Sequence, residues 1–144
     1  SGCEECGLGV ESADDRVLKL NNKRETVADH IRAIRNLKSA GIRVKTYFMA
    51  GLPGETQETL NLNKQFVHDT KPEKWTLSTF TPYPGSAVYK SPGLFGVQII
   101  NFDWSKWGNF VSSFNHTLIG QTPEQLWNRY KFFYDWLREE KNWK

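Results

Sequence analysis

Residues able to bind a polar cofactor occur in three segments of the sequence, each of which follows an apolar run. Glu11 and Ser12 follow the first run; their oxygens suit ribose hydroxyls or an ammonium group, although both residue types also cap helices. Residues 51–56, Gly-Leu-Pro-Gly-Glu-Thr, expose backbone that a flat ligand such as adenine can approach closely, and they lack the Gly-Lys-Ser/Thr ending of a P-loop. Residues 81–86, Thr-Pro-Tyr-Pro-Gly-Ser, form the third segment, in which Tyr83 is a candidate substrate contact.

Arginine and cysteine side chains add two further candidates. Arg24 can pair with the carboxylate of a ligand, and an exposed arginine without a ligand is the alternative. Cys3 and Cys6 form a C-x-x-C pair, but no second Cys/His pair follows at a spacing typical of zinc sites. The pair therefore predicts reduced thiols beside a strand in a cytoplasmic protein, with a redox or zinc role as the alternative. We assign no metal ligand and no catalytic residue from the sequence.

Hydrophobic periodicity predicts the elements that must position these residues. We expect strands over residues 6–10, 42–49 and 75–80, and helices over 26–40 and from 56 to about 68. Helical connections of this length join parallel strands, so the sequence predicts an α/β sheet or part of a (βα) barrel, with both helices on one side. Ligands meet the carboxyl ends of parallel strands, which is where the three polar segments lie.

Capping residues define the ends of the first of these helices. Thr26 is a good N-cap with Asp29 three positions later, and Gly41 is the expected stop. In the second helix, we expect Glu55 in the first turn, where an acidic side chain interacts favourably with the helix dipole.

The last third of the chain has a different character. Residues 102–144 contain 12 of the 20 aromatic residues, and Thr122-Pro123 followed by Gln125 predicts the start of a final helix. Packing against the α/β layer explains this aromatic stripe, and a substrate-facing lid or a partner surface is the alternative.

Composition limits the class of protein. A length of 144 residues is typical of one domain. The formal charge is +3, and the basic residues are spread along the chain, which argues against a nucleic-acid-binding face. We find no apolar run near the ~20 residues that a membrane span requires and no signal peptide. Because the chain begins without Met and enters a strand almost at once, we expect it to be a piece of a longer reading frame.

An ordered set of motifs resembles the second half of a radical S-adenosylmethionine (SAM) domain, and most of all the radical SAM enzymes that carry a cobalamin-binding domain. These motifs are residues 7–12, 15–19, 23–26, 40–42, 51–56 and 81–86. The resemblance implies strands four to six of a six-stranded, TIM-like partial barrel over residues 1–90, with an aromatic, mainly helical extension over 91–144. It also implies the cofactors SAM and a [4Fe–4S] cluster, with cobalamin in some members.

Residue roles follow from the same resemblance. By position, Glu11 takes the family's role of binding SAM polar groups, with Ser12 beside it, and Arg24 is a candidate for the SAM carboxylate. Met49, Ala50, Gly51 and Leu52 are expected to line the adenine.

One departure from the family is that its C-x-x-x-C-x-x-C cluster loop does not occur in this sequence. Cys3 and Cys6 are too few, and they lie before or at the start of strand four instead of following strand one, so we expect the cluster ligands in a missing N-terminal half of the same protein. The expected activity of that parent is reductive cleavage of SAM to start radical chemistry on a small molecule or another, unknown substrate, with methyl transfer in cobalamin-linked members. A non-catalytic α/β binding or interaction module is the alternative.

Overall fold

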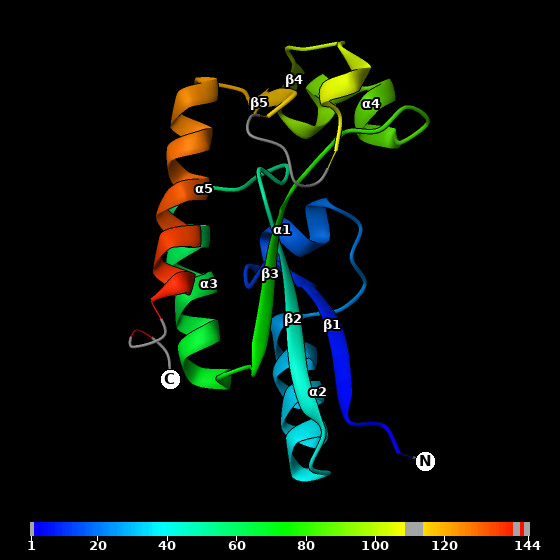
Figure 1. Ribbon diagram of the computed structural model, residues 1–144. Helices are drawn as coiled ribbons and strands as arrows, with labels where there is room; N and C mark the ends of the chain where they lie inside the picture. The colour runs from blue at the N-terminus through cyan, green and yellow to red at the C-terminus, as the bar shows by residue number, and fades with distance from the viewer. Residues whose placement is uncertain (1, 109–113, 140–141, 143–144) are drawn as a thin grey trace.

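Three parallel strands form the central sheet. The computed structural model describes residues 2–108, 114–139 and 142, so that Phe110 and Trp143 lie outside the described residues. Strands β1 (Glu5–Glu11), β2 (Arg43–Ala50) and β3 (Lys74–Thr79) lie in the order β1-β2-β3, and both pairings are parallel. This arrangement confirms the strands predicted from the sequence and their order. All three carboxyl ends lie at the upper edge of the sheet in Figure 1.

Two helices connect the strands, and their ends agree with the capping residues. Helix α2 (Val27–Ser39) begins after the Thr26 capping box, and helix α3 (Gln57–Thr70) begins after a second capping box at Thr56. Helix α5 (Pro123–Arg138) begins after a third capping box, at Thr122, and packs against α3 (Figure 1). Each box satisfies amide groups that a helix N-terminus would otherwise leave unpaired.

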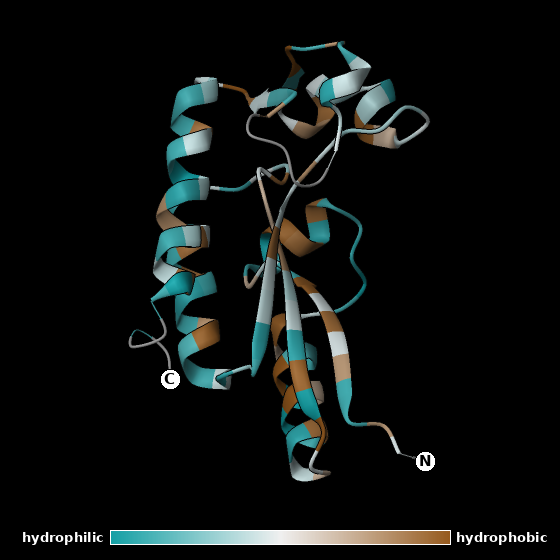
Figure 2. Ribbon diagram, in the orientation of Figure 1, coloured by the Kyte–Doolittle hydropathy of each residue, from teal (hydrophilic) through white to brown (hydrophobic). Residues whose placement is uncertain are grey.

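One hydrophobic core lies between the sheet and these three helices. Alternate residues of β2 are buried, and Phe48 meets Phe66 of α3 and Phe133 of α5 in edge-to-face contacts with ring centroids 6.0 and 5.5 Å apart. Ile34 of α2 belongs to the same cluster, so α2, α3 and α5 cover the same face of the sheet. Hydrophobic residues accordingly recur along the strands and α2 in Figure 2, with hydrophobic bands along α5.

The opposite face of the sheet is open among the described residues. Lys45, Tyr47 and Met49 alternate with the buried residues of β2, and Tyr47 is 39% exposed. Gly7 lies beneath the Tyr47 ring, where an added Cβ would be 2.8 Å from Cε2. A parallel sheet is normally covered on both faces, and in a partial barrel this second face would be the interior.

Several short elements were not predicted from the sequence. These are α1 (Asp15–Leu20), α4 (Ala87–Lys90), two 3₁₀ helices (η1, Pro92–Phe95, and η2, Trp104–Lys106), and strands β4 (Val97–Ile99) and β5 (His116–Leu118). β4 and β5 pair antiparallel, so the extension over 91–144 contains a small sheet beside its helices. Among the described residues, the helices are too short or too polar to span a bilayer.

Candidate functional site

A cavity of about 550 Å³ opens at the carboxyl ends of the strands. Its volume lies within the usual range for small-molecule sites, roughly 300–1,000 Å³. Most of the lining is apolar, with one carboxylate and one ammonium group among the lining residues, which are Glu11, Val17, Leu18, Leu20, Asn21, Asn22, Lys23, Met49, Leu52, Phe80, Ala87, Val88 and Phe95. The structure therefore brings Glu11, Met49 and Leu52 of the predicted residues to one site.

Glu11 occupies an unusual backbone conformation at the end of β1. Its φ is 60°, in the left-handed region that non-glycine residues rarely adopt, and such outliers cluster at binding and active sites. The pairing of β1 with β2 shifts register between Gly9 and Glu11. A Cβ at position 9 would lie 2.9 Å from Glu11 Oε1, so the glycine leaves room for this carboxylate.

Lys23 supplies the positive charge of the cavity. Its Nζ lies 3.8 Å from Glu11 Oε1 and donates a hydrogen bond to the Gly9 carbonyl at 3.1 Å. Burial raises the pKa of Glu11 above its ordinary value, and the ammonium group of Lys23 opposes that shift. Sequence reasoning chose the neighbouring Arg24 instead. Lys23 lies in the turn after the unpredicted helix α1, where its amide donates a hydrogen bond to the Leu18 carbonyl at 2.9 Å.

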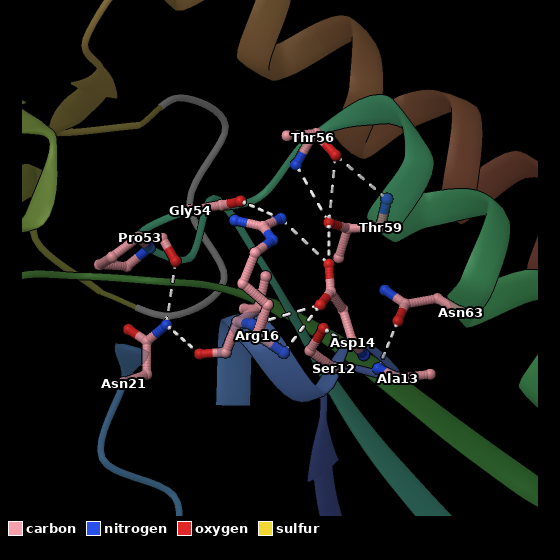
Figure 3. A network of polar contacts seen from close by, with 11 residues as sticks. Ser12, Ala13, Asp14, Arg16, Asn21, Pro53, Gly54, Thr56, Thr59 and Asn63 are labelled. Atoms are coloured by element: carbon pink, nitrogen blue, oxygen red, sulfur yellow. Dashed lines mark hydrogen bonds and ion pairs between the residues drawn. The ribbon is translucent and has the colours of Figure 1, made fainter. Parts of the chain in front are cut away.

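The loop after β2 is tied to the segment after β1 by polar contacts (Figure 3). Arg16 Nη2 donates to the Gly54 carbonyl at 2.9 Å, and Asn21 Nδ2 donates to the Pro53 carbonyl at 3.0 Å. Asp14, the N-cap of α1, also accepts a hydrogen bond from Thr59 Oγ1 at 2.9 Å. These contacts hold two of the cavity walls, α1 and the loop, in a fixed relation.

Ser12 and Arg24 lie away from the cavity lining. Ser12 is buried, and its hydroxyl accepts a hydrogen bond from the Asp14 amide at 3.3 Å. The N-cap of α1 is Asp14, so Ser12 does not cap this helix. Arg24 is exposed in the connection between α1 and α2.

The remaining predicted residues lie in or near the other two loops. Ala50 and Gly51 are buried between the cavity-lining Met49 and Leu52. Tyr83 is 45% exposed, and its ring lies 6.4 Å from that of Trp107, outside the cavity lining.

Glu55 differs from its predicted place in the first turn of the helix. Thr56 is the N-cap, so Glu55 precedes the helix, and its side chain is only 2% exposed. Its Oε2 accepts a hydrogen bond from the Gly51 amide at 3.0 Å, and its Oε1 lies 3.8 Å from Arg129 Nε of α5. A glutamate immediately before a capping threonine gives no signal of burial, because its partner lies more than 70 residues later.

The cysteines do not form an iron–sulfur site within the described part of the chain. Cys3 is exposed and Cys6 is half-buried, both are free thiols, and the described residues contain no group of three or more His, Cys, Asp or Glu residues arranged to hold a metal. A [4Fe–4S] cluster is normally held by cysteine thiolates, so this donor set does not fit one. Cys6 also lies near the amino end of β1, whereas the cavity lies at the carboxyl end.

Comparison with known proteins finds similarity to one superfamily over part of the chain. Residues 1–66 match the Radical SAM superfamily. The anaerobic magnesium-protoporphyrin IX monomethyl ester cyclase of Cereibacter sphaeroides is 32% identical over 93% of this chain and 22% of its own length. The bacteriochlorophyllide d C-12(1)-methyltransferase of Chlorobaculum tepidum is 26% identical over 83% of this chain and 26% of its own length.

A solved structure shares the fold. The radical S-adenosylmethionine methyltransferase TsrM from Kitasatospora setae, solved with cobalamin and a [4Fe–4S] cluster bound, aligns with a TM-score of 0.55 at 17% identity. The alignment covers 90% of this chain and 26% of TsrM. The chain therefore shares the fold of part of this solved enzyme, and it spans about a quarter or less of the length of the two curated relatives.

Proposed function

We propose that this chain, which carries part of a radical SAM domain, supplies one wall of the SAM site of a radical SAM enzyme. The observation that carries the proposal is the cavity at the carboxyl ends of the parallel strands, where Glu11 lies with Met49 and Leu52. Ligands of open α/β sheets and barrels bind at this edge.

The chemistry of the cavity fits an adenosyl group attached to an amino acid. Apolar side chains such as Leu52 and Phe80 suit the adenine ring, while the Glu11 carboxylate can accept hydrogen bonds from ribose hydroxyls or an ammonium group. Lys23 can pair with a ligand carboxylate, the role assigned to Arg24 by resemblance. When bound, SAM supplies an alkyl sulfonium for reductive cleavage, and the residues of this chain bind it, orient it and exclude water.

The proposal also covers the cofactors and the substrate of the whole protein. Radical SAM enzymes use a [4Fe–4S] cluster, and we place its ligands on a part of the protein other than this chain, because the thiols described above do not fit it. The cyclase and methyltransferase names of the relatives support a small-molecule substrate and, with TsrM, cobalamin-linked methyl transfer. Two free thiols support a reducing, cytoplasmic location.

A calorimetric titration of the chain with SAM tests the proposal. Glu11→Gln keeps the size and one acceptor oxygen of the side chain but removes its charge. Losing a charge-assisted hydrogen bond costs roughly 1.5–3 kcal/mol, so we expect SAM affinity to fall about ten- to a hundredfold with little change in melting temperature.

A matched control lies at the opposite end of the same strand segment. The Glu4 side chain is 84% exposed and pairs only with Arg43, at 3.6 Å, among the described contacts. Glu4→Gln should therefore leave SAM affinity unchanged. If Glu11→Gln binds SAM as well as the unaltered chain, Glu11 is not part of the site, and if the unaltered chain does not bind SAM, the non-catalytic interaction module becomes the better interpretation.

A further inference from the structure

The C-terminal segment reaches back to the loop that borders the cavity. His116, the first residue of β5, is fully buried, and its Nε2 lies 2.8 Å from the Gly51 carbonyl oxygen. A carbonyl only accepts, so Nε2 carries the proton and donates. The imidazole is held edge-on by Phe80 and Phe114, with ring centroids 5.4 and 5.6 Å away.

Glu55 and Arg129 hold the other side of the same residue. The Gly51 amide donates to Glu55 Oε2 at 3.0 Å, and Arg129 Nε of α5 lies 3.8 Å from the second carboxylate oxygen. Both backbone groups of Gly51 are thus bound by buried side chains, Glu55 and His116. His116, and Arg129 that pairs with Glu55, come from the last 30 residues of the chain. We call Glu55, His116 and Arg129 the Gly51 clamp.

The clamp acts on the residue between two walls of the cavity. Met49 and Leu52 line the cavity on either side of the buried pair Ala50-Gly51. Gly51 has a φ of 79°, and an added Cβ would lie 2.6 Å from Phe114 Cε1, so the C-terminal segment packs directly on this backbone. A shift of the Gly51 peptide would move Leu52 and change the shape of the cavity.

A contribution to stability alone does not explain the polar groups of the clamp. Glu55 Oε1, His116 Nδ1 and two nitrogens of Arg129 are buried without a hydrogen-bond partner among the described residues. Burial raises the pKa of Glu55 to about 7, against the Arg129 charge and the Gly51 and Leu52 amides, and burial lowers the pKa of His116 to about 4. An apolar cluster of the same volume is often as stable as a buried ion pair, so a role in placing the loop accounts better for these groups.

We infer that His116 and Glu55 are positioning residues for the proposed SAM site. They fix both backbone groups of Gly51 and thereby set the place of Leu52 against the adenine. Arg129 holds the Glu55 carboxylate. This inference rests on the proposed function. It makes β5 and α5 part of the binding machinery, although neither contributes a side chain to the cavity lining.

Two substitutions of His116 separate positioning from packing. His116→Gln can place an amide nitrogen near the position of Nε2 and keep the hydrogen bond to Gly51, whereas His116→Phe keeps an aromatic ring between Phe80 and Phe114 but has no donor. In the 144-residue chain, SAM affinity is measured by calorimetry, and exchange of the Gly51 and Leu52 amides is measured by NMR.

We expect His116→Phe to bind SAM about tenfold more weakly and to exchange the Gly51 amide at least about tenfold faster, because a buried carbonyl loses its partner. His116→Gln should stay within about threefold of the unaltered chain in both measurements. Glu55→Gln, which keeps an acceptor for the Gly51 amide but leaves Arg129 without its counter-charge, should weaken SAM binding by a similar factor.

The possible outcomes distinguish the clamp from the function on which it rests. Normal SAM affinity and slow Gly51 exchange in His116→Phe would overturn the clamp and leave the SAM site intact. Equal losses in His116→Gln and His116→Phe would also overturn it, because the donor would then not be the feature that matters. If the unaltered chain does not bind SAM, the proposed function fails and the assigned role fails with it, whereas the exchange rates still report whether His116 orders the loop.

Discussion

Two separate constraints fix a glycine at position 51. Its φ of 79° disfavours any side chain, and Phe114 occupies the space that a Cβ would need. Gly51→Ala should therefore destabilise the chain by about 2–5 kcal/mol, from roughly 1–2 kcal/mol of left-handed strain and about 1–3 kcal/mol of overpacking. Gly41 is the control, because it has a similar φ of 74° with nothing within 4 Å of an added Cβ. In urea unfolding, Gly41→Ala should therefore be destabilised only by the left-handed strain, roughly 1–2 kcal/mol.

The buried imidazole of His116 gives stability a dependence on pH. Its folded pKa is about 4, below the ordinary value of 6.5, so the unfolded chain takes up the proton first. The stabilisation is fully present above about pH 6.5 and is lost as the pH falls toward 4, with an upper limit of roughly 3 kcal/mol. Glu55 acts in the opposite direction, because its raised pKa favours folding at low pH and this contribution is lost as the pH rises from 4.5 to about 7.

Comparison of the unaltered chain with His116→Gln isolates the histidine contribution, since Glu55 is present in both. The difference between their free energies of unfolding should shift in favour of the unaltered chain as the pH rises from 4 to 7. A difference that stays constant over this range would show that His116 titrates normally in the folded chain.

The place of a residue could be predicted from the sequence where the signal was local. Glu11 follows a short apolar strand with two glycines, and those features predicted its place at the carboxyl end of β1, where it lines the cavity. Its role in binding SAM stays a prediction. Glu55 and His116 meet through Gly51 although they are far apart in sequence, and no periodic pattern links them. Contacts of this kind depend on tertiary packing, which local propensity does not encode.

At the scale of elements, helix α5 is held to the sheet by one face. Phe133 is fully buried against Phe48 and stacks with Trp136 at 6.3 Å, whereas its neighbour Phe132 is 48% exposed. Phe133→Ala should cost about 3–5 kcal/mol in thermal or urea unfolding, because it leaves a cavity in the core.

Phe132→Ala is the matched control from the same helix turn. It removes a half-exposed ring and a cation–π contact with Lys64, with the ammonium 3.3 Å from the ring centroid, so a loss of about 1 kcal/mol is expected. Equal effects of the two substitutions would mean that α5 does not pack on the sheet through Phe133.

Whether a helix or strand could be predicted depended on the length of its hydrophobic periodicity. Helix α2 has thirteen residues between Thr26 and Gly41, and its predicted ends were confirmed to the residue. Helix α1 has six residues and β4 and β5 three each, too few to show periodicity, and their pairing partners could not be seen in the sequence. Lys23, which lines the cavity, lies in the turn that follows the unpredicted α1.

At the scale of the whole molecule, the covered and open faces of the sheet have different residues. The covered face carries the core residues Val44, Phe48 and Leu77, whereas the open face carries Lys45, Tyr47 and Gly7. A parallel sheet of three strands with one open face is expected to be completed by further structure, as in a radical SAM barrel. The division into residues 1–90 and 91–144 stays a proposal, since Phe114 and Phe133 of the second part share a core with Phe48 of the first.

The arrangement of the thiols relative to the cavity predicts what the isolated chain does with SAM. Cys6 and Glu11 lie near opposite ends of β1, five residues apart, which is roughly 16 Å at the rise of a strand. With only two cysteines, far from the cavity, the chain has no means of delivering an electron to a bound sulfonium. We therefore expect the 144-residue chain to bind SAM without cleaving it.

After anaerobic reconstitution with iron and sulfide, the amount of 5′-deoxyadenosine formed in the presence of a reductant should equal that of a control without protein. Cleavage above this background that requires the reconstituted cluster, and that disappears in Cys3→Ser or Cys6→Ser, would show that these two thiols hold a functional cluster.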